Sequence, residues 1–173
     1  MKFIGSMDRH LFNEGTHTQL YRCLGAHLSE GGTTFGVWAP NAREVRVVGD
    51  FNDWNLDGPL LDKLDDSGLW EGFVPGVKEG ARYKFRVSCK FGDYEVNKAD
   101  PFAAEAELPP ATASVVAQSS YAWGDARWMS SRPHKDAMHA PMSIYEVHLG
   151  SWRRVPEDGN RSLNYREMAD WLV

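Results

Sequence analysis

The middle of the chain alternates between apolar and polar residues. Clusters of Gly, Pro, Asn and Asp separate the alternating runs, which are residues 33–39, 44–49, 69–74 and 82–89. Successive side chains of a strand point to opposite faces, so each run predicts a strand with one buried face. Short strands spaced by turn signals are typical of an antiparallel sandwich. The pattern therefore predicts a mainly β fold, with an immunoglobulin-like antiparallel β-sandwich over residues 33–116.

The alternation also assigns side chains to the two faces of the sheet. In the last run, apolar residues alternate with basic ones, so one face is buried and the other meets water. Lys84 is expected on the wet face. The predicted core residues are Val37, Val47, Tyr83, Phe85 and Val87.

The period changes near the end of the sequence. Residues 143–149 have strand character, residues 151–161 form a charged loop, and Asn164 begins a helix with Glu167 three positions on, as in a capping box. One strand and one helix cannot bury both of their faces alone. Residues 142–173 are therefore predicted to be one βα unit of a barrel or open sheet that continues beyond them.

The remaining segments differ in composition. Residues 1–32 are a polar N-terminal segment that is expected to pack on the sandwich. Residues 117–141 are rich in Ser, Pro, Trp and His and have no lasting periodicity. We interpret them as a linker between residues 33–116 and residues 142–173.

Composition excludes some classes of partner. The net charge of −5 disfavours nucleic acid, which is bound through clustered Lys and Arg. No run approaches the ~20 apolar residues of a membrane span, and the first residues lack a signal-peptide pattern. Cys23 and Cys89 are too few for a disulfide framework and fit a reducing compartment. We expect a cytoplasmic protein with no membrane partner.

Metal and cofactor chemistry has little support in the sequence. His134 and His139 lie five positions apart, but no carboxylate or cysteine cluster completes a site around them. No metal and no cofactor are predicted. Aromatic residues are abundant, with 7 Trp, 6 Tyr and 8 Phe, and flat rings suit the apolar face of a sugar.

Three separated motifs share one resemblance. They are DRHLFNEGTH with LYRCLGAH (residues 8–17 and 20–27), VWAPNA with VVGDFNDW (37–42 and 47–54), and YEVHLGSW with LNYR (145–152 and 163–166). Together they resemble the N-terminal portion of bacterial-type 1,4-alpha-glucan (glycogen) branching enzymes. The third motif resembles the first strand and helix of their barrel, which implies that residues 142–173 are the truncated first βα unit of a TIM-type barrel. The second motif resembles the glucan-binding-type sandwich module that also precedes the barrels of debranching and trehalose-forming relatives.

The resemblance implies a function for the parent enzyme. Such enzymes cleave an α-1,4 linkage and transfer the released segment to a 6-hydroxyl with retention, which uses an Asp nucleophile and a Glu acid/base. The resemblance places these carboxylates on later barrel strands, so no catalytic residue is assigned here and the chain alone is not expected to be an enzyme. The implied partners are α-1,4-glucan, such as glycogen or amylose, and the missing catalytic barrel.

The resemblance also implies a glucan site on the sandwich. Trp54 matches the stacking tryptophan, Lys84 the lysine on the Tyr-Lys-Phe strand, and Tyr94 the aromatic residue of the next loop, with Asn97 as a hydrogen-bonding candidate. Three alternatives stay open. The module could be purely architectural, it could be a protein-interaction sandwich unrelated to carbohydrate, or it could belong to a debranching or trehalose-forming relative.

Overall fold

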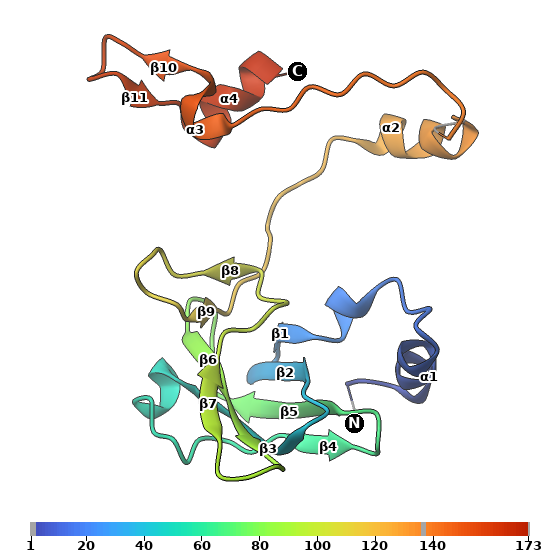
Figure 1. The fold of residues 1–173 in the computed structure, drawn as a ribbon, viewed down its shortest axis with the longest axis vertical. Coiled ribbons are helices and arrows are strands. Elements are labelled where there is room, and N and C mark those ends of the chain that lie inside the picture. Colours follow the sequence, from blue (N-terminus) through green and yellow to red (C-terminus); the bar gives the residue numbers. More distant parts are fainter. Residues whose placement is uncertain (1–2, 136–137, 173) are drawn as a thin grey trace. The chain divides into compact units, whose positions relative to one another are not determined.

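The computed structural model describes residues 3–135 and 138–172, and Figure 1 shows its fold. It divides into two compact units, residues 1–121 and residues 122–173. Within the described ranges, no helix has the length and apolar character needed to cross a membrane. Most of the strands belong to the first unit.

Two antiparallel sheets build the first unit (Figure 1). The first sheet has the order β1-β2-β5-β4 and comprises β1 (Gly25–Ser29), β2 (Gly32–Trp38), β5 (Leu69–Pro75) and β4 (Asp62–Leu64). The second has the order β3-β6-β9-β8, with β7 also paired to β6, and comprises β3 (Ala42–Gly49), β6 (Arg82–Cys89), β9 (Ser114–Val115), β8 (Glu105–Ala106) and β7 (Glu95–Lys98). The predicted antiparallel sandwich is confirmed.

The core contains side chains from both sheets. Phe35 of β2 meets Tyr83 of β6 edge-on, with ring centroids 5.0 Å apart. The predicted core residues Val37, Val47, Tyr83 and Phe85 are buried. Val87 packs against the same cluster but stays partly exposed. The period-two pattern therefore identified the buried face of β6, because its inward side chains cluster with those of β2.

The N-terminal segment covers part of the first sheet. Helix α1 (Ser6–Glu14) ends at Gly15, which adopts the left-handed conformation, and a 3-10 turn η1 (Leu20–Arg22) follows. A second apolar cluster joins this segment to β4 and β5 through Ile4, Cys23, Leu24, Leu64 and Leu69. The sheet also begins earlier than the alternation indicated, because β1 pairs with β2 along its whole length.

The second unit departs from the predicted strand. Residues 143–148 have no regular structure, and the helix α3 (Leu149–Trp152) follows them. The prediction of a strand at 143–149 is therefore wrong for this structure. A strand is stabilised by backbone hydrogen bonds to a neighbour, and no strand within the described ranges pairs with these residues. The same unit contains α2 (Ala126–Ser131) and the 3-10 turn η3 (Arg132–His134).

The predicted helix after Asn164 is confirmed. Helix α4 (Tyr165–Leu172) begins where Asn164 Oδ1 accepts hydrogen bonds from the backbone N–H groups of Arg166 and Glu167, both at 3.0 Å. The Glu167 carboxylate accepts the Asn164 N–H at 2.8 Å, which completes the capping box. A short hairpin of β10 (Arg154–Val155) and β11 (Arg161–Ser162) precedes the helix, so most of the stretch predicted as a charged loop at 151–161 is instead a hairpin whose strands pair with each other.

Candidate functional site

The turn that follows β3 holds Trp54 in an unusual backbone conformation. A 3-10 turn η2 (Asp50–Asn52) ends at Asp53, and both Asp53 and Trp54 have positive φ, 53° and 57°. Positive φ is unfavourable for residues other than glycine. The Trp54 N–H donates to the Gly49 carbonyl at 2.9 Å, which closes the turn. The indole is partly exposed.

Glycine at position 49 permits a close approach of two backbones. A Cβ atom there would lie 2.2 Å from the Arg82 carbonyl oxygen of the neighbouring strand β6. Gly49 of the VVGDFNDW motif is therefore needed for the η2 turn to pack against β6.

The Asp50 carboxylate connects the turn to β6. Its Oδ1 accepts the Trp54 indole N–H at 3.1 Å. Its Oδ2 accepts the backbone N–H of Arg82 at 3.1 Å and the Arg82 Nε–H at 2.8 Å. The hydrogen bonds from Arg82 lower the pKa of Asp50 below its usual value.

Lys84 lies on the same outward face of β6 as Arg82. Its Nζ donates to Thr112 Oγ1 at 2.7 Å. Arg82 Nη1 donates to Glu107 at 3.2 Å, and the other oxygen of Glu107 accepts the Ala113 N–H at 2.9 Å. These bonds tie the loop between β8 and β9 to the face that carries both basic side chains.

Asn97 shares this outward face. It pairs with Arg86 across β6 and β7, and cross-strand partners point to the same side of a sheet. Arg86 lies two positions along β6 from Lys84, so Asn97 belongs to the next row of side chains. The Asn97 side chain is exposed.

Tyr94 lies elsewhere. The register of β6 and β7 pairs Phe85 with Lys98, so the position across from Lys84 is Ala99. Tyr94 instead lies across from Cys89, whose N–H donates to the Tyr94 carbonyl at 2.9 Å. Cys89 is five residues from Lys84, which corresponds to about 16 Å along a strand. The structure therefore brings Trp54, Lys84 and Asn97 to one face of the second sheet and separates Tyr94 from them.

The Tyr94 side chain lines a groove that does not include Trp54 or Lys84. This groove has a volume of about 280 Å³ and is mainly apolar, with Trp38, Val87 and Val96 among its lining residues. Tyr94 itself is 60% exposed. An adjoining hollow of about 330 Å³ shares Trp38 and Val87 and extends to Pro101.

Sequence reasoning missed Asp50, Arg82, Glu107 and Thr112 as parts of the Trp54 and Lys84 surface. Arg82 could have been found from the period-two pattern, because it lies two positions before Lys84. Thr112 and Glu107 come from another segment, and only the tertiary structure brings them to β6.

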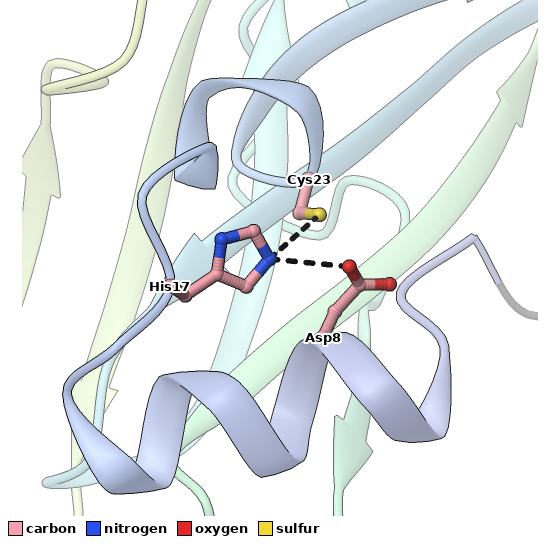
Figure 2. Close-up of side chains that lie close together, drawn as sticks. All are labelled: Asp8, His17 and Cys23. Carbon is pink, nitrogen blue, oxygen red and sulfur yellow. Dashed lines mark hydrogen bonds and ion pairs between the residues drawn. The ribbon is translucent and has the colours of Figure 1, made fainter.

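A second cluster of chemically reactive side chains joins α1 to the segment that follows it. Figure 2 shows Asp8, His17 and Cys23 converging, with His17 Nε2 3.1 Å from Asp8 Oδ1 and 3.8 Å from Cys23 Sγ. The three could offer ligand atoms within 4.8 Å of one another, and they form the one such group within the described ranges. No pattern in the sequence indicates this cluster, because its three members lie on separate local elements.

Hydrogen bonding at the opposite ring nitrogen indicates what this cluster does. The Gln19 N–H donates to His17 Nδ1 at 3.1 Å, so Nδ1 must be unprotonated and Nε2 carries the proton. A metal bound at Nε2 would need the other tautomer. Burial raises the pKa of the Cys23 thiol to about 11, so the thiol is protonated at neutral pH. The cluster therefore holds the N-terminal segment together by hydrogen bonds.

Comparison with known families defines the class of the first unit. Residues 23–103 match the family described as carbohydrate-binding module 48 (isoamylase N-terminal domain). This range includes β1 to β7, the η2 turn, Trp54, Lys84 and Asn97. Residues 23–103 of the first unit are thus similar to family 48 carbohydrate-binding modules.

Comparison with whole proteins is more specific. The chain is similar to the 1,4-alpha-glucan branching enzymes of Albidiferax ferrireducens (56% identity over 96% of the chain and 26% of that enzyme), Myxococcus xanthus (52%, 98% and 24%) and Aquifex aeolicus (48%, 98% and 27%). The chain spans about a quarter of the length of these curated relatives. The resemblance to the N-terminal portion of branching enzymes is confirmed.

Solved structures of pullulanases also resemble part of the chain. The pullulanase of Klebsiella pneumoniae complexed with maltotriose is 25% identical, with a TM-score of 0.47 over 55% of this chain and 9% of that chain. The pullulanase of Bacillus acidopullulyticus is 26% identical, with a TM-score of 0.44 over 55% of this chain and 12% of that chain.

Proposed function

We propose that the module binds α-1,4-glucan on the outward face of its second sheet, with Trp54 as the stacking platform. The observation that carries this proposal is the fixed arrangement of Trp54, Arg82 and Lys84 around Asp50 and Thr112. Glucose presents an apolar C–H face and a rim of hydroxyls, so its binding needs a flat ring beside a few oriented polar groups. This surface supplies both.

Charge and exposure on this face suit a neutral polyol. Arg82 is paired with Asp50 and Glu107, so its positive charge is largely neutralised, while its side chain remains 51% exposed. Lys84 is partly exposed and hydrogen-bonded to a hydroxyl. Asn97 adds an exposed amide in the next row, which can donate to and accept from sugar hydroxyls. Tyr94 has no part in this surface.

In the whole protein we propose that this module holds a glucan chain near a catalytic barrel. The relatives to which the chain is similar are branching enzymes, and the proposed reaction is cleavage of an α-1,4 linkage followed by transfer to a 6-hydroxyl. Residues 142–173 are proposed to form the beginning of that barrel. The carboxylates of such retaining chemistry are proposed to lie in the part of the protein that this sequence does not include.

Affinity electrophoresis in gels that contain glycogen tests the glucan site. We expect retardation of the chain, because one platform and its polar rim support binding in about the millimolar range. Trp54→Ala should abolish the retardation and Lys84→Ala should reduce it, while Tyr94→Ala serves as a matched aromatic control that leaves it unchanged. Circular dichroism establishes that each variant is folded.

Two outcomes would contradict this proposal. Migration of the unsubstituted chain that is independent of glycogen would show that the module is architectural. Retardation that is lost with Tyr94→Ala but kept with Trp54→Ala would move the site to the apolar groove beside Val87.

A further inference from the structure

We propose that Asp50 is a positioning residue for glucan, which sets the indole of Trp54 and the guanidinium of Arg82 as one preorganised surface. This inference rests on the proposed function of the Trp54 face. It adds a residue whose role is to orient the platform rather than to touch the sugar.

The backbone conformation of Trp54 depends on its contacts. Its backbone has a φ of 57°, and the preceding residue also has positive φ. Such conformations persist only where surrounding contacts enforce them. For Trp54 those contacts are the backbone bond to Gly49 and the side-chain bond to Asp50.

The hydrogen bond from the indole to Asp50 orients the ring of Trp54. A tryptophan side chain has two rotatable bonds, and its Nε1–H is its one hydrogen-bond donor. When Asp50 Oδ1 accepts that donor at 3.1 Å, the edge of the ring that carries nitrogen is fixed, and the direction of the ring faces is fixed with it. Because stacking on a sugar requires one free face in a defined direction, the bond prepares the platform before glucan arrives.

Asp50 also connects the turn to β6. Asp50 Oδ2 accepts two donors of Arg82, the backbone N–H at 3.1 Å and the Nε–H at 2.8 Å. One carboxylate thus holds the ring and the neighbouring cation in a fixed relation. Arg82 keeps exposed donors that are available to sugar hydroxyls.

A direct role of Asp50 in binding sugar is disfavoured by its own contacts. Its two oxygens already accept three donors from within the module, and its side chain is only 32% exposed. Asp50 therefore acts through Trp54 and Arg82.

The test measures affinity for maltoheptaose by calorimetry and for glycogen by gel retardation. Asp50→Ala should weaken binding about tenfold, the factor expected when one charge-assisted hydrogen bond stops contributing. Asp50→Asn keeps an acceptor for the indole but presents an amide to Arg82, so its loss should be smaller. Asp57→Ala is the matched control, because Asp57 is an exposed carboxylate of the same loop.

Two readouts separate positioning from general stability. In NMR spectra, the Nε1–H resonance of Trp54 is assigned by its absence in Trp54→Ala. Its chemical shift should change in Asp50→Ala and remain the same in Asp57→Ala. In the Trp54→Phe background, which keeps an aromatic ring but lacks the indole N–H, Asp50→Ala should cause a smaller loss of affinity than in the unsubstituted chain, because the two residues act as a unit.

The outcomes distinguish this inference from the function on which it rests. If Trp54→Ala leaves affinity unchanged, the proposed glucan site is wrong. If Trp54→Ala abolishes binding while Asp50→Ala binds as the unsubstituted chain does, the positioning role alone is wrong. Should Asp50→Ala fail to fold, Asp50→Asn decides, and an affinity for maltoheptaose equal to that of the unsubstituted chain overturns the inference.

Discussion

The phenol of Tyr83 donates a hydrogen bond of 2.5 Å to Oδ2 of Asp100, and both residues are buried. Asp100 Oδ1 accepts the Phe102 N–H at 2.8 Å, and the Asp100 N–H donates to Ser114 Oγ at 2.8 Å. This pair connects β6 to the segments on either side of β8. Burial raises the pKa of the Asp100 carboxyl above its ordinary value of 3.8.

The raised pKa predicts a pH dependence of stability. The folded state binds the Asp100 proton more tightly than the unfolded state does. The stability that this proton contributes is therefore fully present below the pKa of Asp100 in the unfolded chain, and it is lost as pH rises through the higher pKa of the folded chain. The free energy of unfolding of the unsubstituted chain should therefore fall relative to that of Asp100→Asn between acid and neutral pH. Urea titrations of both proteins at several pH values measure the difference, with Asp93→Asn as an exposed control. Parallel profiles would contradict the prediction.

The aromatic contact between the sheets predicts where the sandwich is most sensitive. Phe35 is fully buried against Tyr83 and Phe85. Phe35→Ala should lower the free energy of unfolding by about 3–5 kcal/mol. Phe73 on the neighbouring strand is 51% exposed. Phe73→Ala should therefore change the free energy of unfolding by less than about 1 kcal/mol. Equal effects in chemical denaturation would contradict this assignment of the core.

The cluster around His17 predicts different reactivities of the two cysteines. With the pKa of Cys23 raised to about 11, only about one thiol in ten thousand is ionised at neutral pH, and the side chain is buried. Iodoacetamide should therefore modify Cys89, which is partly exposed, before Cys23 in the native chain. Mass spectrometry of peptides measures both rates, and the unfolded chain, in which the two rates should become similar, is the control. Faster native modification of Cys23 would contradict the hydrogen-bonded arrangement in Figure 2.

The two units should differ in protection from hydrogen exchange. Strands β2, β3, β5 and β6 pair along their length around the main core. In residues 138–172 Met168 is the only buried hydrophobic side chain, and Ile144 is 83% exposed. Because protection follows local burial and hydrogen bonding, residues 142–173 should exchange faster than the four strands. Mass spectrometry after deuterium labelling tests this, and equal protection would show that the second unit has a core of its own.

The chain by itself is predicted to lack branching and hydrolytic activity on amylose. Retaining chemistry needs two carboxylates about 5 to 5.5 Å apart, which the motif resemblance assigns to barrel strands outside this sequence. Iodine staining and reducing-end assays should match buffer. Turnover that is abolished by substituting any carboxylate of this chain would refute the assignment.

Local patterns in the sequence were sufficient for much of the fold. The alternation in β6 placed Tyr83 and Phe85 inside and Lys84 outside, because the period of a strand fixes the face of every side chain. The start of α4 was equally predictable, because Asn164 and Glu167 satisfy each other's backbone groups within one helical turn.

Features that depend on distant partners required the tertiary structure. Strand character at 143–149 did not yield a strand, because backbone pairing needs a neighbour and sequence pattern cannot supply one. The register between β6 and β7 decided that Asn97 shares the face of Lys84 and that Tyr94 does not, since each step along a strand displaces a side chain by about 3.3 Å and reverses its face. Asp50 gained its three donors only because Gly49 lets the turn approach β6. The sequence by itself thus determined the alternating strands of the sandwich, the faces of their side chains and the start of α4, and the tertiary structure decided which strands pair and which side chains meet.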